Sequence, residues 1–245
     1  MPRNQAEAIV LRASKFKDQD KSVVFFSREH GLIEGIAKGA LKSKKRFGSS
    51  LEPMSYVKVF YYEKEGTRYV TVGDCDLIED FYEIQTNPPV LFTLAYFAEL
   101  IEESRPAPNE DDLLFRLLLQ ILRALKAGGE PEFLAAYFET WFLKINGYLP
   151  DLSSCKGCRQ DIVATGWLSH RKDGAVCESC ANYKKEEIIP EFLDFLKWVK
   201  KNPPSKTAEP SFSLAQIQSI RGVLKEIIVF HLEHSPKTLG KFLDK

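Results

Sequence analysis

Two Cys-x-x-Cys pairs dominate the second half of the chain, with eighteen residues between them. A Cys-x-x-Cys turn places two sulfurs on one side of a tight loop, so two facing turns can hold Zn²⁺ tetrahedrally at Zn–S distances of about 2.3 Å. Short apolar stretches flank the turn signal Lys172-Asp173-Gly174 between the pairs, which predicts a hairpin. We therefore expect a zinc ribbon at about residues 150–183. Its ligands would be Cys155, Cys158, Cys177 and Cys180.

Two disulfides or four buried thiols are the alternatives to a metal. Residues 1–7 are polar and the apolar run at 8–11 is too short for a secretory signal, so we expect a cytoplasmic chain in which disulfides are rare. Four thiolates leave no position for water, which indicates one structural zinc per chain. The fifth cysteine, Cys75, is expected to be a packed residue.

Motifs for catalysis are sparse. The sequence has no Gly-x-x-x-x-Gly-Lys-Ser/Thr, no Gly-x-Gly-x-x-Gly after a strand and no Gly-x-Ser-x-Gly. A zinc deaminase would combine Cys-x-x-Cys with a preceding His-x-Glu, but here His231-Leu232-Glu233 follows the cysteines. We do not expect an enzyme.

Charge is distributed unevenly along the 245 residues, although the formal net charge is zero. Lys and Arg outnumber Asp and Glu by 11 to 5 in residues 1–50, and acids outnumber bases by 17 to 8 in residues 51–150. Residues 38–46 carry five cations and no acid, which favours a polyanionic partner over a merely solvated loop. No apolar run approaches the roughly 18 residues of a membrane span, so we expect no membrane association.

The first part of the chain is rich in β-branched and aromatic residues. Short segments of this kind, separated by turn signals, predict a small barrel. The expected strands cover residues 6–12, 21–28, 32–37, 55–62 and 68–74. Five strands with basic loops fit an OB-fold domain over residues 1–80, with Phe16, Phe25, Phe26 and Tyr56 as base-stacking or core residues.

Helical periodicity begins after residue 89 and predicts a helical domain over residues 81–245. Apolar residues recur at i, i+3 and i+4, with Asn109 and Ser213 as expected caps. The expected helices cover residues 90–103, 110–126, 132–146, 190–201 and 213–234. The fold class is thus α+β, an N-terminal five-stranded OB-fold barrel followed by a helical domain with an inserted four-cysteine ribbon.

Several segments together resemble the RecO family. They are the opening Ala8-Ile9-Val10-Leu11, the Ile-Glu-Gly-Ile-Ala-Lys-Gly-Ala segment at residues 33–40, and the Gly-Tyr-Leu-Pro segment at residues 147–150 just before the cysteines. The resemblance implies a bacterial recombination and repair mediator. It would bind single- and double-stranded DNA without sequence specificity, anneal complementary strands and, with RecR, help to load RecA onto DNA coated by single-strand-binding protein. It also implies association with the nucleoid.

Candidate contact residues follow from charge and expected placement. For DNA phosphates we nominate Arg12, Lys15, Lys17, Lys21, Lys38, Lys42, Lys44, Lys45 and Arg46. The family recognises the acidic, apolar tail of single-strand-binding protein, which needs an apolar groove flanked by cations. For that tail we nominate Arg116, Arg123, Lys126, Arg221 and Lys225.

An alternative function is a zinc-ribbon transcription-type or protein-interaction factor. In that case the ribbon itself would contact DNA. Its cations would be Lys156, Arg159, Arg171 and Lys172.

Overall fold

The computed structural model describes residues 3–43, 45–64, 66–104, 111–205 and 212–238. The chain divides into two compact units, Met1–Leu122 with Lys241–Lys245, and Arg123–Gly240. The first unit therefore includes more than the expected OB-fold segment. We describe the two units separately.

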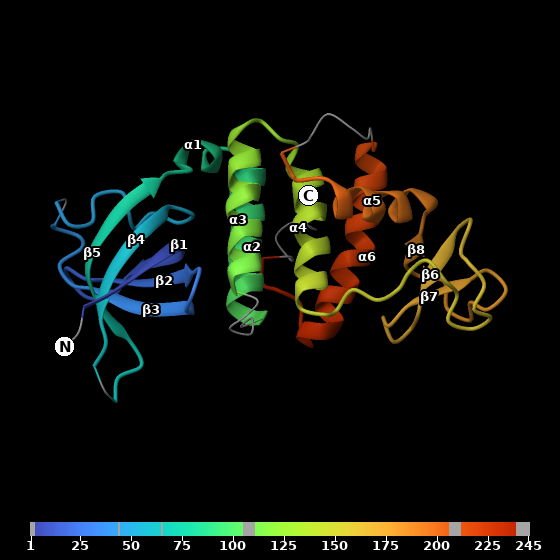
Figure 1. Ribbon diagram of the computed structural model, residues 1–245, viewed down its shortest axis with the longest axis horizontal. Coiled ribbons are helices and arrows are strands. Elements are labelled where there is room, and N and C mark those ends of the chain that lie inside the picture. The colour runs from blue at the N-terminus through green and yellow to red at the C-terminus, as the bar shows by residue number, and fades with distance from the viewer. Residues whose placement is uncertain (1–2, 44, 65, 105–110, 206–211, 239–245) are drawn as a thin grey trace. The chain divides into compact units, whose positions relative to one another are not determined.

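The first unit is built on a closed five-stranded barrel with strand order β1-β2-β3-β5-β4 (Figure 1). Pairing is antiparallel except between β3 and β5, which are parallel. The strands are β1 Arg3–Lys15, β2 Lys21–Ser27, β3 Gly31–Ala37, β4 Tyr56–Tyr62 and β5 Val70–Glu79. This arrangement confirms the predicted OB-fold barrel, although β1 and β5 are longer than expected.

Strand β1 closes the barrel because it pairs on both sides. Its first half pairs with β4 and its second half with β2, and the register with β2 shifts between Val10 and Arg12. A bulge of this kind bends a strand and increases its twist, which closure of a small barrel requires.

Alternating side chains fill the barrel. Phe25, Val57 and Val59 are fully buried in its core, and full burial of such a side chain contributes about 1.5–3 kcal/mol. Gly35 lies where β3 meets β5, and a Cβ there would come within 2.7 Å of Val72 Cγ2. The parallel pairing of β3 and β5 therefore depends on a residue without a side chain.

Three helices follow the barrel in the sequence. Two were expected, and the short first helix was not. They are α1 Tyr82–Gln85, α2 Pro88–Ser104 and α3 Asp111–Lys126, whose last turn belongs to the second unit. Within the first unit, Phe115 packs against Phe26 and Tyr56 with ring centroids 6.2 and 5.9 Å apart. The start of α3 is thereby held to the barrel by buried aromatic rings.

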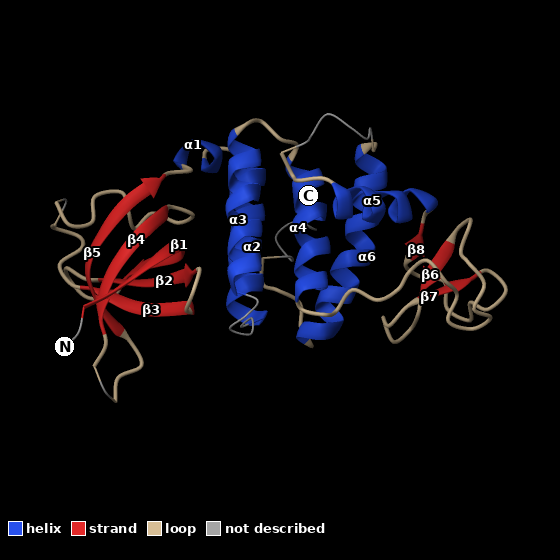
Figure 2. Ribbon diagram, viewed as in Figure 1, coloured by secondary structure: helices blue, strands red, loops and turns tan. Residues whose placement is uncertain are grey.

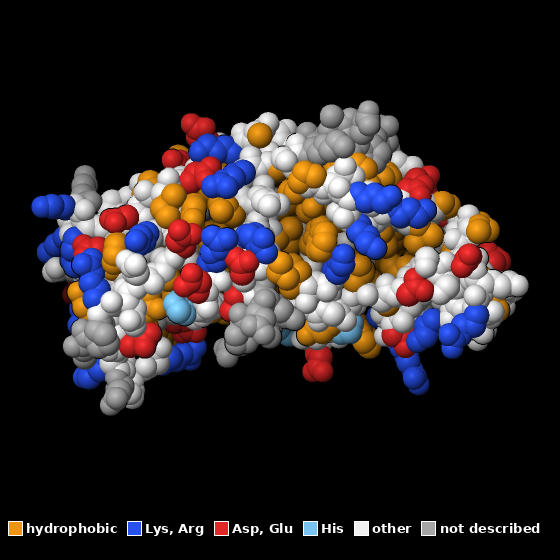
Figure 3. All heavy atoms as spheres, in the orientation of Figure 1, with side chains coloured by type: hydrophobic (Ala, Val, Ile, Leu, Met, Phe, Trp, Pro, Cys, Tyr) orange, Lys and Arg blue, Asp and Glu red, His pale blue; other side chains and the backbone are white. Residues whose placement is uncertain are grey.

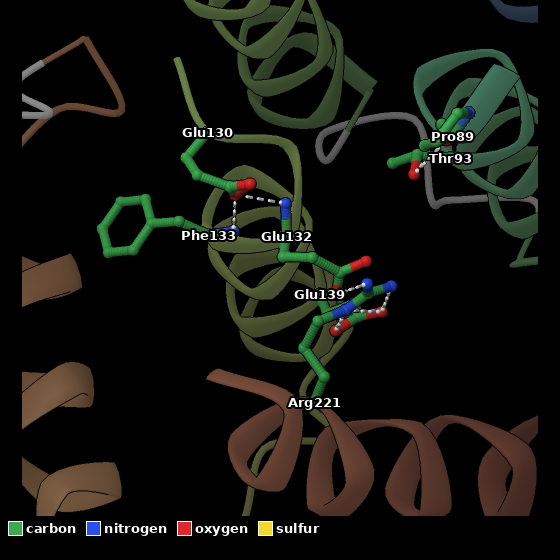
Figure 4. Close-up of polar contacts among 7 residues, drawn as sticks. All are labelled: Pro89, Thr93, Glu130, Glu132, Phe133, Glu139 and Arg221. Carbon is green, nitrogen blue, oxygen red and sulfur yellow. Dashed lines mark hydrogen bonds and ion pairs between the residues drawn. The ribbon is translucent and has the colours of Figure 1, made fainter. Parts of the chain in front are cut away.

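The second unit contains the remaining helices that the periodicity predicted (Figure 2). They are α4 Pro131–Ile145, α5 Pro190–Lys201 and α6 Leu214–Leu232. Ser213 and Gln216 form a capping box at the start of α6, as the sequence predicted for Ser213. At α4 the Glu130 carboxylate accepts hydrogen bonds from the N–H groups of Glu132 and Phe133 (Figure 4).

The ribbon lies between α4 and α5 in the sequence and has three strands rather than two. They are β6 Gly166–Leu168, β7 Ala175–Cys177 and β8 Glu187–Ile188, in the order β7-β6-β8. The two-residue β8 is too short to give a sequence signal. It carries the ribbon beyond the expected boundary, towards the start of α5.

Ion pairs fix the ribbon to α6. Lys172 in the ribbon turn is buried, and its Nζ lies 2.9 Å from Glu186 Oε2 and 3.4 Å from Glu226 Oε2 of α6. Lys185 contacts the same two carboxylates at 3.3 and 3.8 Å. Within the second unit, this network of two lysines and two glutamates therefore attaches the ribbon to α6.

Across the described ranges, no helix combines the length and apolar character needed to cross a membrane.

Candidate metal centre and nucleic-acid interface

The four predicted cysteine ligands converge at one point of the ribbon. Their Sγ atoms all lie within 4.8 Å of one another, and Cys158 Sγ is 3.8 Å from Cys177 Sγ. A tetrahedron with metal–sulfur bonds of about 2.3 Å has sulfur–sulfur edges of about 3.8 Å. The cluster therefore has the dimensions of a four-thiolate metal site.

Local backbone groups favour thiolate at part of this cluster. The backbone N–H groups of Cys158 and Cys177 lower the pKa of Cys155 to about 6, and the Ser179 hydroxyl lowers the pKa of Cys177. Hydrogen bonding with the neighbouring sulfurs of Cys177 and Cys155 instead raises the pKa of Cys180 to about 12. Four adjacent thiolates repel one another, so full deprotonation of the set needs a cation among them.

Glycine at position 157 leaves room for the second Cys-x-x-Cys pair beside the first. A Cβ there would lie 3.0 Å from Cys180 Sγ. The Cys-Lys-Gly-Cys sequence therefore lets the second pair approach closely, which is a feature that the spacing alone does not reveal.

Two basic loops of the barrel are joined to each other. The Gly39 N–H donates to Asp20 Oδ1 at 2.8 Å, and the Leu41 N–H donates to the Gln19 carbonyl at 3.1 Å. We call residues 15–20 and 38–46 the paired loops. They bring together exposed cations that are far apart in the sequence. These cations are Lys15, Lys17, Lys38, Lys42 and Lys45.

Arg46 braces the second of these loops. Its guanidinium donates to the Lys38 carbonyl at 2.8 Å and to Ser43 Oγ at 3.1 Å, and it lies 4.9 Å from the ring centroid of Phe47. Phe47 is itself buried in the barrel core. Arg46 thus has a positioning role as well as an exposed charge, whereas Lys44 lies outside the described residues.

Two other nominated cations have carboxylate partners. Arg12 pairs with Glu102 of α2 at 3.0 Å, and Lys21 pairs with Glu52 at 3.4 Å. The hydrogen bond to Glu102 raises the pKa of Arg12. A phosphate would have to compete with these carboxylates.

The nominated aromatic residues divide by position. Phe25 and Phe26 are fully buried and Tyr56 is buried, so they are core residues. Phe16 is exposed on the paired loops, and Lys17 Nζ lies 5.5 Å from its ring centroid. Tyr69, which the sequence analysis missed, is also exposed, with the Arg68 guanidinium 5.5 Å from its ring centroid.

Arg221 does not provide a surface cation, contrary to its nomination for tail binding. It is buried and contacts Glu139 and Glu132, and Figure 4 shows its side chain reaching from α6 to these acids on α4. It lies on the same face of α6 as the buried residues Ile217 and Leu224. Its spacing from these apolar residues was the sequence signal that could have predicted its burial. We remove Arg221 from the tail-binding candidates.

The other nominated helical cations lie on α3 and α6. Arg116 pairs with Asp112 one turn earlier, and Arg123 and Lys126 lie in the last turn of α3. Lys225 is half-buried, and burial lowers its pKa. None of these four residues lines the groove described next.

A groove between α4 and α5 has the character expected of the tail receptor. It encloses about 200 Å³ and combines apolar side chains with two lysines. We call it the α4–α5 groove, and its principal lining residues are Trp141, Lys144, Leu149, Leu196, Val199 and Lys200. Figure 3 shows hydrophobic side chains gathered over α4 and α5 with Lys and Arg beside them. Lys144 Nζ lies 4.1 Å from the Trp141 ring centroid. This i, i+3 pair was the available sequence signal.

Two of the four ribbon cations nominated for the alternative function form ion pairs with carboxylates. Lys156 pairs with Asp173, and buried Lys172 pairs with Glu186 and Glu226. Arg159 and Arg171 are exposed. The ribbon therefore presents fewer exposed, unengaged cations than the paired loops.

Comparison with known proteins gives matches along nearly the whole chain. The family described as "Recombination protein O N terminal" matches residues 1–81, and "Recombination protein O C terminal" matches residues 86–240. The chain is 31% identical over 241 residues to a DNA repair protein RecO from Koribacter versatilis, covering 98% of each chain. It is 31% identical over 243 residues to a DNA repair protein RecO from Pelotomaculum thermopropionicum, covering 98% of this chain and 93% of the relative.

Proposed function

The chain belongs to the RecO family of DNA repair proteins, and on that premise we propose that it is a recombination mediator whose paired loops bind DNA phosphates. In this role it binds single- and double-stranded DNA, anneals complementary strands and, with RecR, helps to load RecA onto DNA coated by single-strand-binding protein. It acts in the cytoplasm at the nucleoid and needs no covalent catalysis.

The observation that carries this proposal is the joining of the two basic loops. Hydrogen bonds at Gly39 and Leu41 join the two loops, and five lysines are exposed on them. Lysine and arginine side chains that neutralise the phosphate backbone supply sequence-independent affinity. Phe16, exposed on the same loops, adds a surface on which an unpaired base can stack.

Annealing follows from contacts that hold the backbone and leave the base edges accessible. Phosphate contacts position a strand without reading its sequence. Two complementary strands held in this way can shift until their bases pair. The mechanism therefore requires binding that depends strongly on salt and weakly on sequence.

The test compares two sets of alanine substitutions in the full chain. The first set changes Lys15, Lys17, Lys38, Lys42 and Lys45, and the second changes Lys156, Arg159 and Arg171 of the ribbon. Each phosphate contact contributes about 0.7 to the log–log salt slope for single strands, so the first set should flatten the slope by up to about 3.5 and slow annealing.

The ribbon set serves as the matched comparison. It should leave both the slope and the annealing rate unchanged. A flattened slope in the ribbon set, with an unchanged slope in the loop set, would instead support the zinc-ribbon factor.

Zinc is the metal that we assign to the cysteine cluster. Tetrahedral four-thiolate sites are typical of structural zinc, and they leave no position for a reacting water. When bound, zinc supplies a crosslink between the two knuckles. Cys155, Cys158, Cys177 and Cys180 would hold it.

We further propose that the α4–α5 groove receives the tail of single-strand-binding protein. Trp141 and Val199 offer apolar contacts for the tail, and Lys144 and Lys200 offer partners for its acids. Replacement of both lysines by Glu should weaken the binding of a tail peptide by about tenfold or more, because like charges across an interface cost several kcal/mol. Lys197→Glu, on an exposed lysine of α5 outside the groove lining, is the control.

A further inference from the structure

A polar groove in the first unit lies along β1, β2 and β3 of the barrel and is bordered by the ends of α2 and α3. It encloses about 740 Å³ and is lined by residues that include Arg12, Arg68, Tyr69, Glu34 and Glu102. The β2–β3 face and the adjoining loops are where OB-folds bind oligonucleotides. The groove therefore occupies the ligand face of the barrel.

Two arginines in this groove are each held by a carboxylate through a pair of hydrogen bonds. Arg12 donates from Nε and Nη2 to the two Glu102 oxygens at 3.4 and 3.0 Å. Arg68 donates from the same two nitrogens to the two Glu34 oxygens at 3.1 and 3.0 Å. The two arginines are thus bound in the same manner on one face.

The geometry of these pairs is the geometry of phosphate binding. The guanidinium fork matches carboxylate and phosphate alike, with two parallel N–H···O bonds. Each carboxylate therefore occupies the donors that a DNA phosphate would use. Tyr69 beside Arg68 adds an exposed ring suited to an unstacked base, which favours a single strand over a duplex.

The partner of Arg12 comes from outside the barrel. Glu102 belongs to α2, and its side chain is 25% exposed while that of Arg12 is 59% exposed. An exposed ion pair of this kind is weak enough for a multivalent polyanion to displace. Through Glu102, α2 can therefore weaken the binding of DNA to Arg12 without preventing it.

We propose that Glu102 masks Arg12, so that α2 limits the affinity of the barrel's ligand face for single-stranded DNA, with Glu34 masking Arg68 in the same way. This regulation rests on the proposed DNA-binding function. Binding of the strand exchanges each carboxylate for a phosphate on the same guanidinium. Removal of the mask should strengthen binding and add a phosphate contact.

The test measures mixed-sequence single-stranded DNA binding across a salt series with Glu102→Gln in the full chain. Release of one surface pair should tighten binding up to about fivefold and steepen the salt slope by about 0.7. Glu83→Gln is the matched control, because it removes one exposed negative charge that forms no ion pair among the described residues. Thermal unfolding of each variant verifies that it folds.

A second comparison assigns any gain to Arg12. The gain from Glu102→Gln should disappear when Arg12→Gln is also present. An equal gain from Glu83→Gln, or a gain that survives in the double variant, would overturn the mask because the effect would be one of overall charge.

The outcomes distinguish failure of the proposed mask from failure of the proposed DNA-binding function. Unchanged affinity in Glu102→Gln, with normal DNA binding by the unmodified chain, would overturn the mask and leave the mediator proposal intact. Failure of the unmodified chain to bind DNA would overturn both. The salt slope of the lysine variant of the paired loops, which should be flatter than that of the unmodified chain, tests the mediator proposal independently.

Discussion

Arg221 of α6 and Glu139 of α4 form an ion pair inside the helical unit, with Nη2 and Oε1 2.9 Å apart and side chains only 6% and 0% exposed. Burial opposes the charge on Arg221, but attraction to Glu139 and Glu132 outweighs it and raises the arginine pKa. Both charges have been removed from water, so each depends on the other for compensation.

Removal of the acid should therefore be costly. Glu139→Ala leaves the buried guanidinium with Glu132 as its remaining acid, and we expect a loss of about 3–5 kcal/mol in the free energy of unfolding, measured with urea. Asp194→Ala breaks an exposed pair with Lys197 on α5 and should leave stability unchanged within error. A double replacement, Glu139→Leu with Arg221→Met, should recover most of the loss. A double variant as unstable as Glu139→Ala would show that the charges are not the cause.

Thiol reactivity should report the metal site in three steps. Burial raises the pKa of the Cys75 thiol to about 12, so this cysteine has almost no thiolate near neutral pH and should react only after unfolding. A thiol reagent should find no rapidly reacting cysteine in the zinc-loaded chain, four after chelation and all five after denaturation. Elemental analysis should give one zinc per chain. The Cys75→Ser variant is the control, because its only thiols are the four of the cluster. A rapidly reacting thiol in that variant when it is loaded with zinc would contradict the assignment of these cysteines as zinc ligands.

Acid should weaken the link between Arg28 and Asp112. The hydrogen bond from Arg28 Nε, at 2.7 Å, lowers the pKa of Asp112 below its ordinary value. Since the folded pKa is the lower one, the pair stabilises the chain above the ordinary value, and this contribution is lost as pH falls through the folded pKa. The stability difference between the chain and Asp112→Asn should shrink on acidification.

A carboxyl NMR titration tests the same pair directly. Arg28→Gln should move the pKa of Asp112 upward, towards its ordinary value. Asp18→Asn, which removes an exposed carboxylate from the paired loops, should leave the titration of Asp112 unchanged. No movement in Arg28→Gln would exclude the guanidinium as the cause.

Loss of Lys172 should loosen the ribbon from α6 without emptying the metal site. Lys172→Met leaves Glu186, whose side chain is 7% exposed, paired with Lys185 as its remaining cation. We expect faster hydrogen exchange at β8 and at the adjoining part of α6, with zinc content unchanged. Lys184→Met, at a more exposed pair with Glu178, is the control. Equal exchange in the two variants would show that Lys172 does not anchor the ribbon.

The sequence was sufficient to predict the five barrel strands, the five longer helices and the cysteine cluster, because their signals are local. Strand alternation, helix periodicity and the cap at Ser213 each depend on residues a few positions apart. The predicted barrel, the helices and the four converging cysteines are accordingly found in the structure. Contacts of the proposed sites with DNA and protein partners stay predictions.

Pairings between distant residues could not be predicted in the same way. Arg12 is a typical surface cation by type, and only the packing of α2 brings Glu102 to it. The α4–α5 groove likewise joins Trp141 to Val199 across the inserted ribbon. Arg221 was the exception, since a cation in the apolar stripe of α6 and an acid in the buried face of α4 together indicate an internal pair.

Helix α6 makes two separate connections within little more than one turn. Arg221 joins it to α4, and Glu226, five positions later, joins it to the ribbon. Each residue of an α-helix advances the side-chain direction by about 100°. A single insertion or deletion between these positions would turn one connection away from its partner while leaving the other in place. The length of this segment is therefore constrained even where the identities of its residues are free to vary.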